Sequence, residues 1–173
     1  CDALARLDDW PALDRNAQIQ LLFTAFLHDS GKPATTLLDP ESGRIRAPKH
    51  ALVGAGIARR VLRDLGCPIE QREEIVGLVR YHGRPPHLLE KPSPESTVIE
   101  TSWFANNRLL HLFALADGRG RSSLDPSEAR SEDALHLWRM VAEERHCLDA
   151  PYSFANDHAR FLFFRNELGS LHY

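Results

Sequence analysis

An adjacent histidine and aspartate, His28 and Asp29, are the residues of this sequence best suited to metal chemistry. They close an apolar segment and are followed by Gly31, which predicts that they lie at the end of a buried helix. Neighbouring helical residues point about 100° apart, so both side chains cannot join one apolar face. Imidazole and carboxylate groups are ligands for divalent transition metals, and a helix end gives access to water and substrate. We predict a metal site here; the alternative is a capped helix end with a surface histidine.

Three further metal-competent side chains fall on the apolar faces of predicted helices. His50 shares the helical spacing of the apolar residues after it, and His82 and Asp117 continue the spacing of those before them. A carboxylate on an apolar face is costly unless a charged group meets it. If these three groups converge on His28 and Asp29, each of them gains a polar partner. The alternative is that the three are independent structural residues.

Basic residues close to these groups are candidates for binding phosphate. Lys32 follows Asp29 by three residues and offers a flexible point charge. Arg119 and Arg121 follow Asp117 among glycines, which allow close backbone approach, and guanidinium groups suit bidentate phosphate binding. A solvated surface position is the alternative for each. Weaker candidates of the same kind are Thr35, Thr36, Lys49 and Arg84.

Helical periodicity predicts an all-α chain, because no segment alternates with period two for long enough to form a strand. We expect the helix that ends at Asp29 to be buried on most sides. The predicted helices cover residues 16–29, 48–65, 69–82, 98–105, 108–117, 125–146 and 156–167. The expected buried face of the helix over 48–65 is Val53, Ile57, Val61 and Leu65. The remaining histidines, expected to be structural or exposed, are His87, His111, His136, His146, His158 and His172.

The composition favours one compact domain in the cytoplasm. The 173 residues carry a net charge of -3, so phosphate binding must come from local groups and not from a global basic field. Three cysteines at no metal-ligand spacing argue against a disulfide framework and a zinc knuckle. No segment approaches the ~20 apolar residues of a membrane span, and the first residues show no signal-peptide pattern. We expect no membrane partner.

Four ordered motifs resemble the HD superfamily of metal-dependent phosphohydrolases. They are FLHDSGKP at residues 26–33, HALVGA at 50–55, LVRYH at 78–82 and ADGRGR at 116–121. Over residues 17–121 the chain is also similar to the HD region of bacterial tRNA nucleotidyltransferases. The resemblance implies an HD-domain helical bundle. It also implies that His28, Asp29 and Asp117 are metal ligands, and that His50 and His82 bind a second metal or contact phosphate.

One feature of the HD superfamily is missing. HD enzymes usually carry an additional histidine on the helix before the His-Asp pair, and residues 1–27 contain no histidine. We expect this ligand upstream of Cys1, on a first helix that begins at or before that residue.

The C-terminal residues 151–173 resemble the connection to a P-loop kinase in bacterial end-healing enzymes. In these two-domain proteins an HD phosphoesterase precedes a polynucleotide kinase. We therefore expect an HD phosphoesterase domain at residues 1–150. Residues 151–173 would form a C-terminal helix and linker toward a kinase domain that this chain does not contain. The implied activity is hydrolysis of a 2′,3′-cyclic phosphate or 2′-phosphate at the 3′ end of RNA.

The mechanism that we expect is attack by a metal-activated water. One or two ions of manganese, nickel, cobalt, iron or zinc fit the ligand types. Lys32, Arg119 and Arg121 would orient the phosphate, and His50 or His82 would protonate the leaving oxygen. Two alternatives are a nucleotide or cyclic-nucleotide phosphohydrolase and a non-catalytic HD module that positions tRNA or a neighbouring domain.

Overall fold

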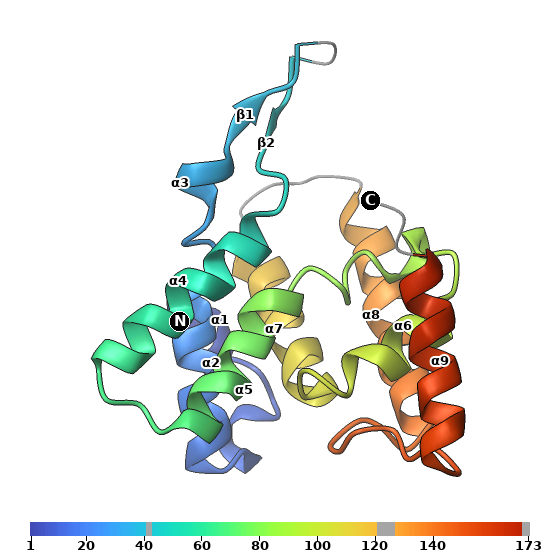
Figure 1. Cartoon of the computed structure of the whole chain (residues 1–173). Helices are drawn as coiled ribbons and strands as arrows, with labels where there is room; N and C mark the ends of the chain where they lie inside the picture. The colour runs from blue at the N-terminus through green and yellow to red at the C-terminus, as the bar shows by residue number, and fades with distance from the viewer. Residues whose placement is uncertain (41–42, 121–126, 171–173) are drawn as a thin grey trace.

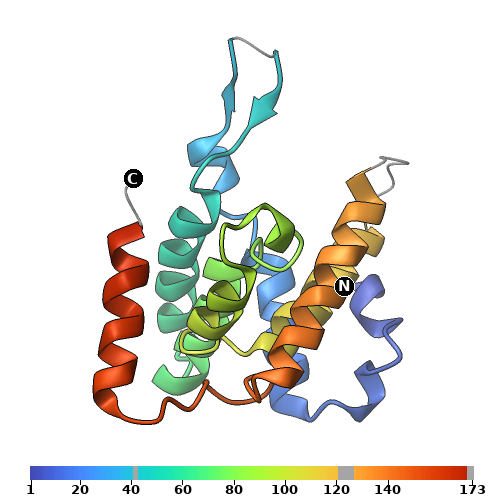
Figure 2. The same cartoon turned by 90° about the vertical axis from the view of Figure 1, so that its right-hand side faces the viewer.

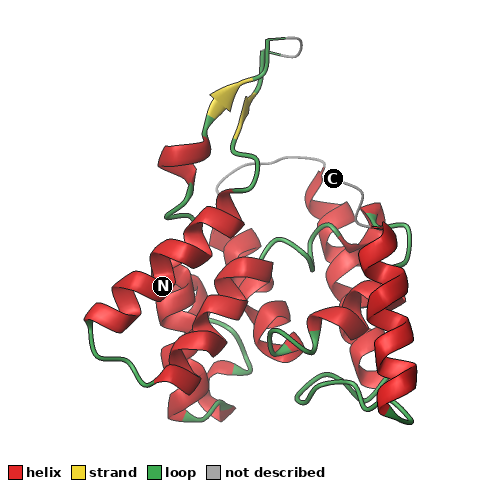
Figure 3. Cartoon of the chain, viewed as in Figure 1, coloured by secondary structure: helices red, strands yellow, loops and turns green. Residues whose placement is uncertain are grey.

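Helices make up nearly all the regular structure of the computed structural model, which describes residues 1–40, 43–120 and 127–170 (Figure 3). The predicted all-α class is confirmed. The helices are α1 (Asp2–Ala5), η1 (Trp10–Ala12), α2 (Arg15–Leu27), α3 (Lys32–Thr35), α4 (His50–Asp64), α5 (Ile69–Tyr81), η2 (Leu88–Glu90), α6 (Pro94–Thr101), α7 (Asn107–Gly120), α8 (Ser127–Glu144) and α9 (Asp157–Ser170). No helix within the described ranges is long and apolar enough to cross a membrane.

A short β-hairpin between α3 and α4 was not predicted. Strands β1 (Leu37–Leu38) and β2 (Ile45–Arg46) pair antiparallel, with Leu37 opposite Arg46. The hairpin projects away from the helices (Figure 1), and all four strand residues are exposed. Strands of two residues are too short to produce the alternating pattern by which a strand is identified from sequence.

The buried face of α4 differs from the predicted one. Its buried residues are Gly54, Ala55, Ala58 and Leu62. Val61 and Leu65 of the expected stripe are 38% and 66% exposed. Ala55 and Ala58 allow α4 to lie close against α5, where Ile75 and Val79 are fully buried, whereas Gly54 faces the turn at Gly31. The tight helix contact therefore selects a neighbouring face with smaller side chains.

The end of α2 is also less buried than predicted. Phe26 is 73% exposed, whereas Leu21 and Thr24 are fully buried. The side of α2 that carries Leu21 faces the larger of two apolar clusters. That cluster joins α1, α2, α5, α6, α7 and α8 through Leu4, Leu21, Leu78, Val98, Leu110 and Trp138. Helix α2 therefore has one solvent-facing side at the end that precedes the His-Asp pair.

Aromatic contacts connect α9 to the rest of the protein. The ring centroid of Trp103 lies 6.0 Å from that of Phe154 and 6.1 Å from that of Phe164. The Arg160 guanidinium lies 5.0 Å from the centroid of the Trp103 ring. Figure 2 shows α9, in red, at the edge of the molecule. The division of the chain after residue 150 stays a prediction.

Candidate metal centre

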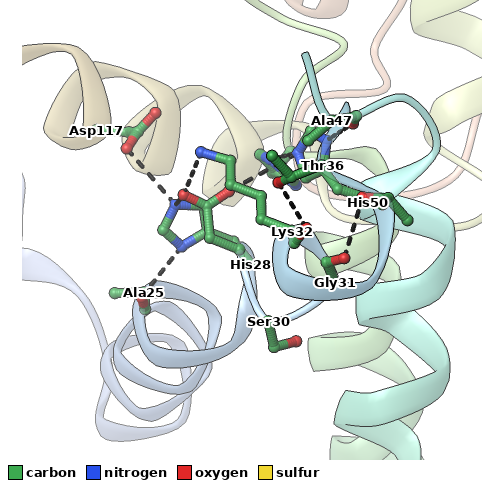
Figure 4. A network of polar contacts seen from close by, with 12 residues as sticks. Ala25, His28, Ser30, Gly31, Lys32, Thr36, Ala47, His50 and Asp117 are labelled. Carbon is green, nitrogen blue, oxygen red and sulfur yellow. Dashed lines mark hydrogen bonds and ion pairs between the residues drawn. The ribbon is translucent and has the colours of Figure 1, made fainter. Parts of the chain in front are cut away.

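Four helix ends bring the predicted metal-binding side chains together. His28 caps the C-terminus of α2, and Asp29 follows it directly. His50 is the first residue of α4, His82 caps the C-terminus of α5, and Asp117 lies near the C-terminal end of α7. Figure 4 shows His28, His50 and Asp117 converging from these separate elements.

The distances between polar atoms define one cluster of all five side chains. His28 Nε2 lies 3.2 Å from Asp29 Oδ2 and 3.7 Å from Asp117 Oδ1. His50 Nε2 lies 3.8 Å from Asp29 Oδ1 and 3.3 Å from His82 Nε2. One ligand atom each from Asp29, His50 and His82 lies within 4.8 Å of the other two. The structure thus places Asp29, His50 and His82 within reach of a common ion, with His28 and Asp117 beside them; the role of all five as ligands stays a prediction.

The three histidines share one hydrogen-bonding pattern. In each, Nδ1–H donates to the backbone carbonyl oxygen of the residue three positions earlier. The acceptors are Ala25 at 3.1 Å for His28, Ala47 at 2.8 Å for His50 and Val79 at 2.8 Å for His82. A carbonyl oxygen only accepts, so the proton of each neutral ring is at Nδ1. The Nε2 lone pairs therefore point into the cluster, as in metal-binding histidines that are oriented by backbone carbonyls.

The electrostatics of the cluster favour the protonation states that bind metal. Burial lowers the pKa of His82 to about 4, and the neighbouring charges of His28 and His50 act in the same direction. His82 is consequently neutral at pH 7. Burial alone would raise the pKa of Asp29, but the hydrogen bond from Lys32 and the charge of His28 leave it below its usual value. A neutral imidazole and an ionised carboxylate are the forms that coordinate a metal.

A close backbone contact sets the position of His50 relative to the His-Asp pair. A Cβ atom on Gly31 would lie 2.1 Å from the His50 carbonyl oxygen and 2.7 Å from the Gly54 amide nitrogen. Only glycine fits at this distance, so the turn after Asp29 lies directly against the start of α4. From the sequence, Gly31 is predicted only to end a helix, because no sequence pattern indicates which backbone it meets.

The predicted phosphate-binding residues have different environments. Lys32 Nζ lies 2.6 Å from Asp29 Oδ2. Arg119 is exposed in the last turn of α7. Arg121 lies outside the described residues. The weaker candidate Arg84 stacks on the Tyr81 ring, 4.4 Å from its centroid, and therefore supports the fold. The remaining weaker candidates are exposed or partly exposed at Thr35, Thr36 and Lys49.

Four side chains of the cluster, those of Asp29, His50, His82 and Asp117, line a cavity of about 350 Å³. Its walls are Asp29, Lys32, His50, His82, Gly83, Pro86, His87, Leu89, Glu90, Ala114, Asp117 and Ser131. This volume lies in the range of small-molecule sites. His87 and Glu90 are cavity residues that sequence analysis missed, because a histidine in a proline-rich loop has no helical spacing to connect it with the site.

Comparisons with known proteins concern the part of the chain that builds this cluster. Residues 4–101 match the family described as HD domain. The CC-adding tRNA nucleotidyltransferase of Thermus thermophilus is 48% identical over 73 residues, which cover 42% of this chain and 16% of that protein. The A-adding tRNA nucleotidyltransferase of Deinococcus radiodurans is 34% identical over 67 residues, which cover 39% and 15%. The chain thus spans a small part of each relative's length. No solved structure matches significantly.

Proposed function

Because the chain belongs to the HD domain family, we propose that it is a metal-dependent phosphoesterase acting on a 2′,3′-cyclic phosphate or 2′-phosphate at an RNA end. The observation that carries the proposal is the set of three imidazoles in which the Nε2 atoms of His50 and His82 face each other and His28 Nε2 faces the carboxylates of Asp29 and Asp117. Two relatives are tRNA nucleotidyltransferases, which supports an RNA 3′ end as substrate.

The residues present fit a divalent transition metal. His50 Nε2 and His82 Nε2 are 3.3 Å apart, and both rings keep their proton at Nδ1, so neither Nε2 donates to the other. Two facing lone pairs beside the Asp29 carboxylate form a ligand set for a cation. We assign one or two ions to His28, Asp29, Asp117, His50 and His82. A metal held there would act as a Lewis acid that activates water and stabilises charge on the phosphoryl oxygens.

The remaining catalytic roles fall to side chains of the cavity and to the basic residues that follow Asp117 in the sequence. We assign the orientation of the phosphate to Lys32, Arg119 and Arg121, with Lys32 exchanging its contact with Asp29 for a phosphoryl oxygen. During opening of the cyclic phosphate, the oxygen of water bonds to phosphorus and one phosphorus–ribose oxygen bond breaks. The attacking water gives up a proton and the leaving oxygen takes one, and we assign this transfer to His50 or His82, through an Nε2 atom that does not hold an ion. The product is a phosphomonoester beside a free hydroxyl.

A free nucleotide is the second substrate class that the cavity supports. About 350 Å³ has room for a small ligand, and this volume alone does not require a polymer. A non-catalytic module that positions tRNA is the other alternative, and the linked kinase domain stays a prediction from the resemblance of residues 151–173.

The proposal is tested by adding Mn²⁺ to the chain and offering three substrates. These are an RNA oligonucleotide ending in 2′,3′-cyclic phosphate, a 2′,3′-cyclic mononucleotide and a nucleoside triphosphate. We expect opening of the RNA end by the wild type, at least ~100-fold slower in Asp29→Asn, since metal catalysis contributes several kcal/mol. Asp64→Asn is the matched control, because Asp64 is exposed at the end of α4.

Other outcomes reject the proposal in different ways. Hydrolysis of the free nucleotides alone would support the second substrate class. A wild type that binds Mn²⁺ without hydrolysing any of the three would support the non-catalytic module. Activity in Asp29→Asn equal to that of the wild type would show that the observed hydrolysis does not depend on the metal cluster.

A further inference from the structure

We propose that His87, oriented by Glu90, is a substrate-binding residue that accepts a hydrogen bond from the 3′-hydroxyl beside a 2′-phosphate. This inference rests on the proposed function, whose substrate carries that hydroxyl. His87 and Glu90 line the same cavity as Asp29, Lys32 and His82, on the segment that follows α5. They therefore face the space in which a substrate phosphate would reach the metal-binding cluster.

The segment that carries His87 is fixed on both sides. Before it, the Arg84 Nη1 atom donates to Thr101 Oγ1 at 2.6 Å and pairs with Glu100 Oε2 at 3.2 Å. After it, Leu88 is fully buried in the larger apolar cluster. A segment anchored in this way holds His87 at a defined place in the cavity wall, which is the condition for selective recognition.

The polar contact between His87 and Glu90 determines which nitrogen of the imidazole can accept a hydrogen bond from a ligand. His87 Nδ1 lies 3.0 Å from Glu90 Oε1, within the turn η2 and its preceding residue. A carboxylate accepts, so the neutral imidazole carries its proton at Nδ1 and presents the Nε2 lone pair. The His87 side chain is 60% exposed. Nε2 is thus available to accept from a hydroxyl group of a ligand.

Different walls of the cavity suit different parts of a substrate. Lys32 and a metal ion held by the cluster would suit the anionic phosphate, whereas the His87 imidazole, hydrogen-bonded to Glu90, suits an uncharged hydroxyl group. Leu89, 44% exposed, adds an apolar surface to the same wall. A sugar offers hydroxyl groups and apolar CH edges without charge. The wall of His87, Leu89 and Glu90 therefore fits the ribose next to the phosphate.

The test removes the hydroxyl and the imidazole separately and together. The chain is loaded with Mn²⁺ and supplied with RNA ending in a 2′-phosphate that carries either a 3′-hydroxyl or a 3′-deoxy position. We expect the wild type to prefer the hydroxyl substrate by about 3- to 10-fold in kcat/KM, the effect of one hydrogen bond. His87→Ala is expected to lose this preference by reacting more slowly with the hydroxyl substrate alone.

Two further variants separate recognition from folding. His136→Ala removes an exposed histidine of α8 and is expected to keep the wild-type preference. Glu90→Gln retains the size of the side chain and is expected to show an intermediate preference; an unchanged value would overturn the orienting role of Glu90. Equal loss on both substrates in His87→Ala, or a preference equal to that of the wild type, would overturn the role of His87.

Failure of the proposed function gives a different result. A wild type that neither releases phosphate from these RNA substrates nor opens the 2′,3′-cyclic phosphate rejects that function and this inference together. A wild type that opens only the cyclic phosphate rejects this inference alone. A wild type that acts on both with no preference for the hydroxyl rejects this inference alone.

Discussion

At the scale of single residues, the site depends on one repeated hydrogen bond. In His28, His50 and His82, which lie at helix ends, Nδ1 donates a hydrogen bond to the backbone carbonyl oxygen of the residue three positions earlier. Which side chains form the site could be predicted from the sequence, because a polar residue on an apolar helix face requires a partner. The orientation of each ring could not, since it depends on a local carbonyl: for His28 and His82 one near the C-terminal end of a helix, and for His50 one that precedes α4.

The buried His82 predicts a specific pH dependence of stability in the metal-free protein. Its pKa is about 4 in the folded chain and about 6.5 when unfolded, so between these values the unfolded state binds more protons. Its contribution is present above pH 6.5 and is lost as the pH falls toward 4, to a total of about 3 kcal/mol. We expect His82→Gln to lose less stability over this interval, measured by urea unfolding with a chelator present.

A control for this measurement is His136→Gln, which changes an exposed histidine. It should retain the wild-type slope of unfolding free energy against pH. His111, whose pKa burial also lowers, contributes in the same direction in every variant. Identical slopes in the wild type and His82→Gln would show that His82 does not titrate as its burial requires.

At the scale of elements, the approach of α4 to the turn after α2 determines the geometry of the site. Because Gly31 contacts the His50 carbonyl directly, Gly31→Ala must separate the two backbones. We expect a loss of about 1–3 kcal/mol in unfolding free energy, as for other overpacked sites, together with weaker Mn²⁺ binding. Chemical denaturation and metal titration of the same preparation measure the two effects.

Gly56→Ala provides the matched control within α4. A Cβ atom there meets nothing within 4 Å, and alanine favours a helix interior. The unfolding free energy of this variant should rise by about 0.5–1 kcal/mol, and its metal binding should be unchanged. A Gly31→Ala protein with the stability and metal affinity of the wild type would contradict the positioning role of this contact.

The elements also show the limits of prediction from sequence. The helices α2, α4, α5 and α7 could be located from the periodicity of their apolar residues, because their length gives several repeats. The buried face of α4 could not, since glycine and alanine count little in an apolar stripe although they permit the closest helix contact. The hairpin of β1 and β2 is too short for any pattern.

At the scale of the whole molecule, the ordered motifs predicted the protein family, which the hydrophobic periodicity could not. The resemblance to the HD superfamily and to the HD region of tRNA nucleotidyltransferases is confirmed by the comparisons. Periodicity alone predicted an all-α chain and a convergence of ligands. It could not indicate η2 as a cavity wall, because the loop from residue 83 to 90 is placed by long-range anchors at Arg84 and Leu88.

The net charge of -3 predicts a weak salt dependence of RNA binding. Under the proposed function, the phosphate contacts come from Lys32, Arg119 and Arg121, so RNA binding should release about three counterions. For single-stranded RNA this gives a slope of about -2.1 in a plot of log binding constant against log salt concentration. Fluorescence anisotropy at several salt concentrations measures it. A slope steeper than about -3 would instead indicate an extended basic surface.

The most direct test of the central claim is the metal content of the purified chain after loading with Mn²⁺ and desalting. We predict one or two ions per chain in the wild type and in the exposed-site control Asp64→Asn. Asp29→Asn should bind at least ~100-fold more weakly, since even the loss of an indirect partner of a metal ligand weakens binding 10- to 100-fold. A wild type that retains no metal, or an Asp29→Asn variant that retains as much, would contradict the assignment of this cluster as a metal centre.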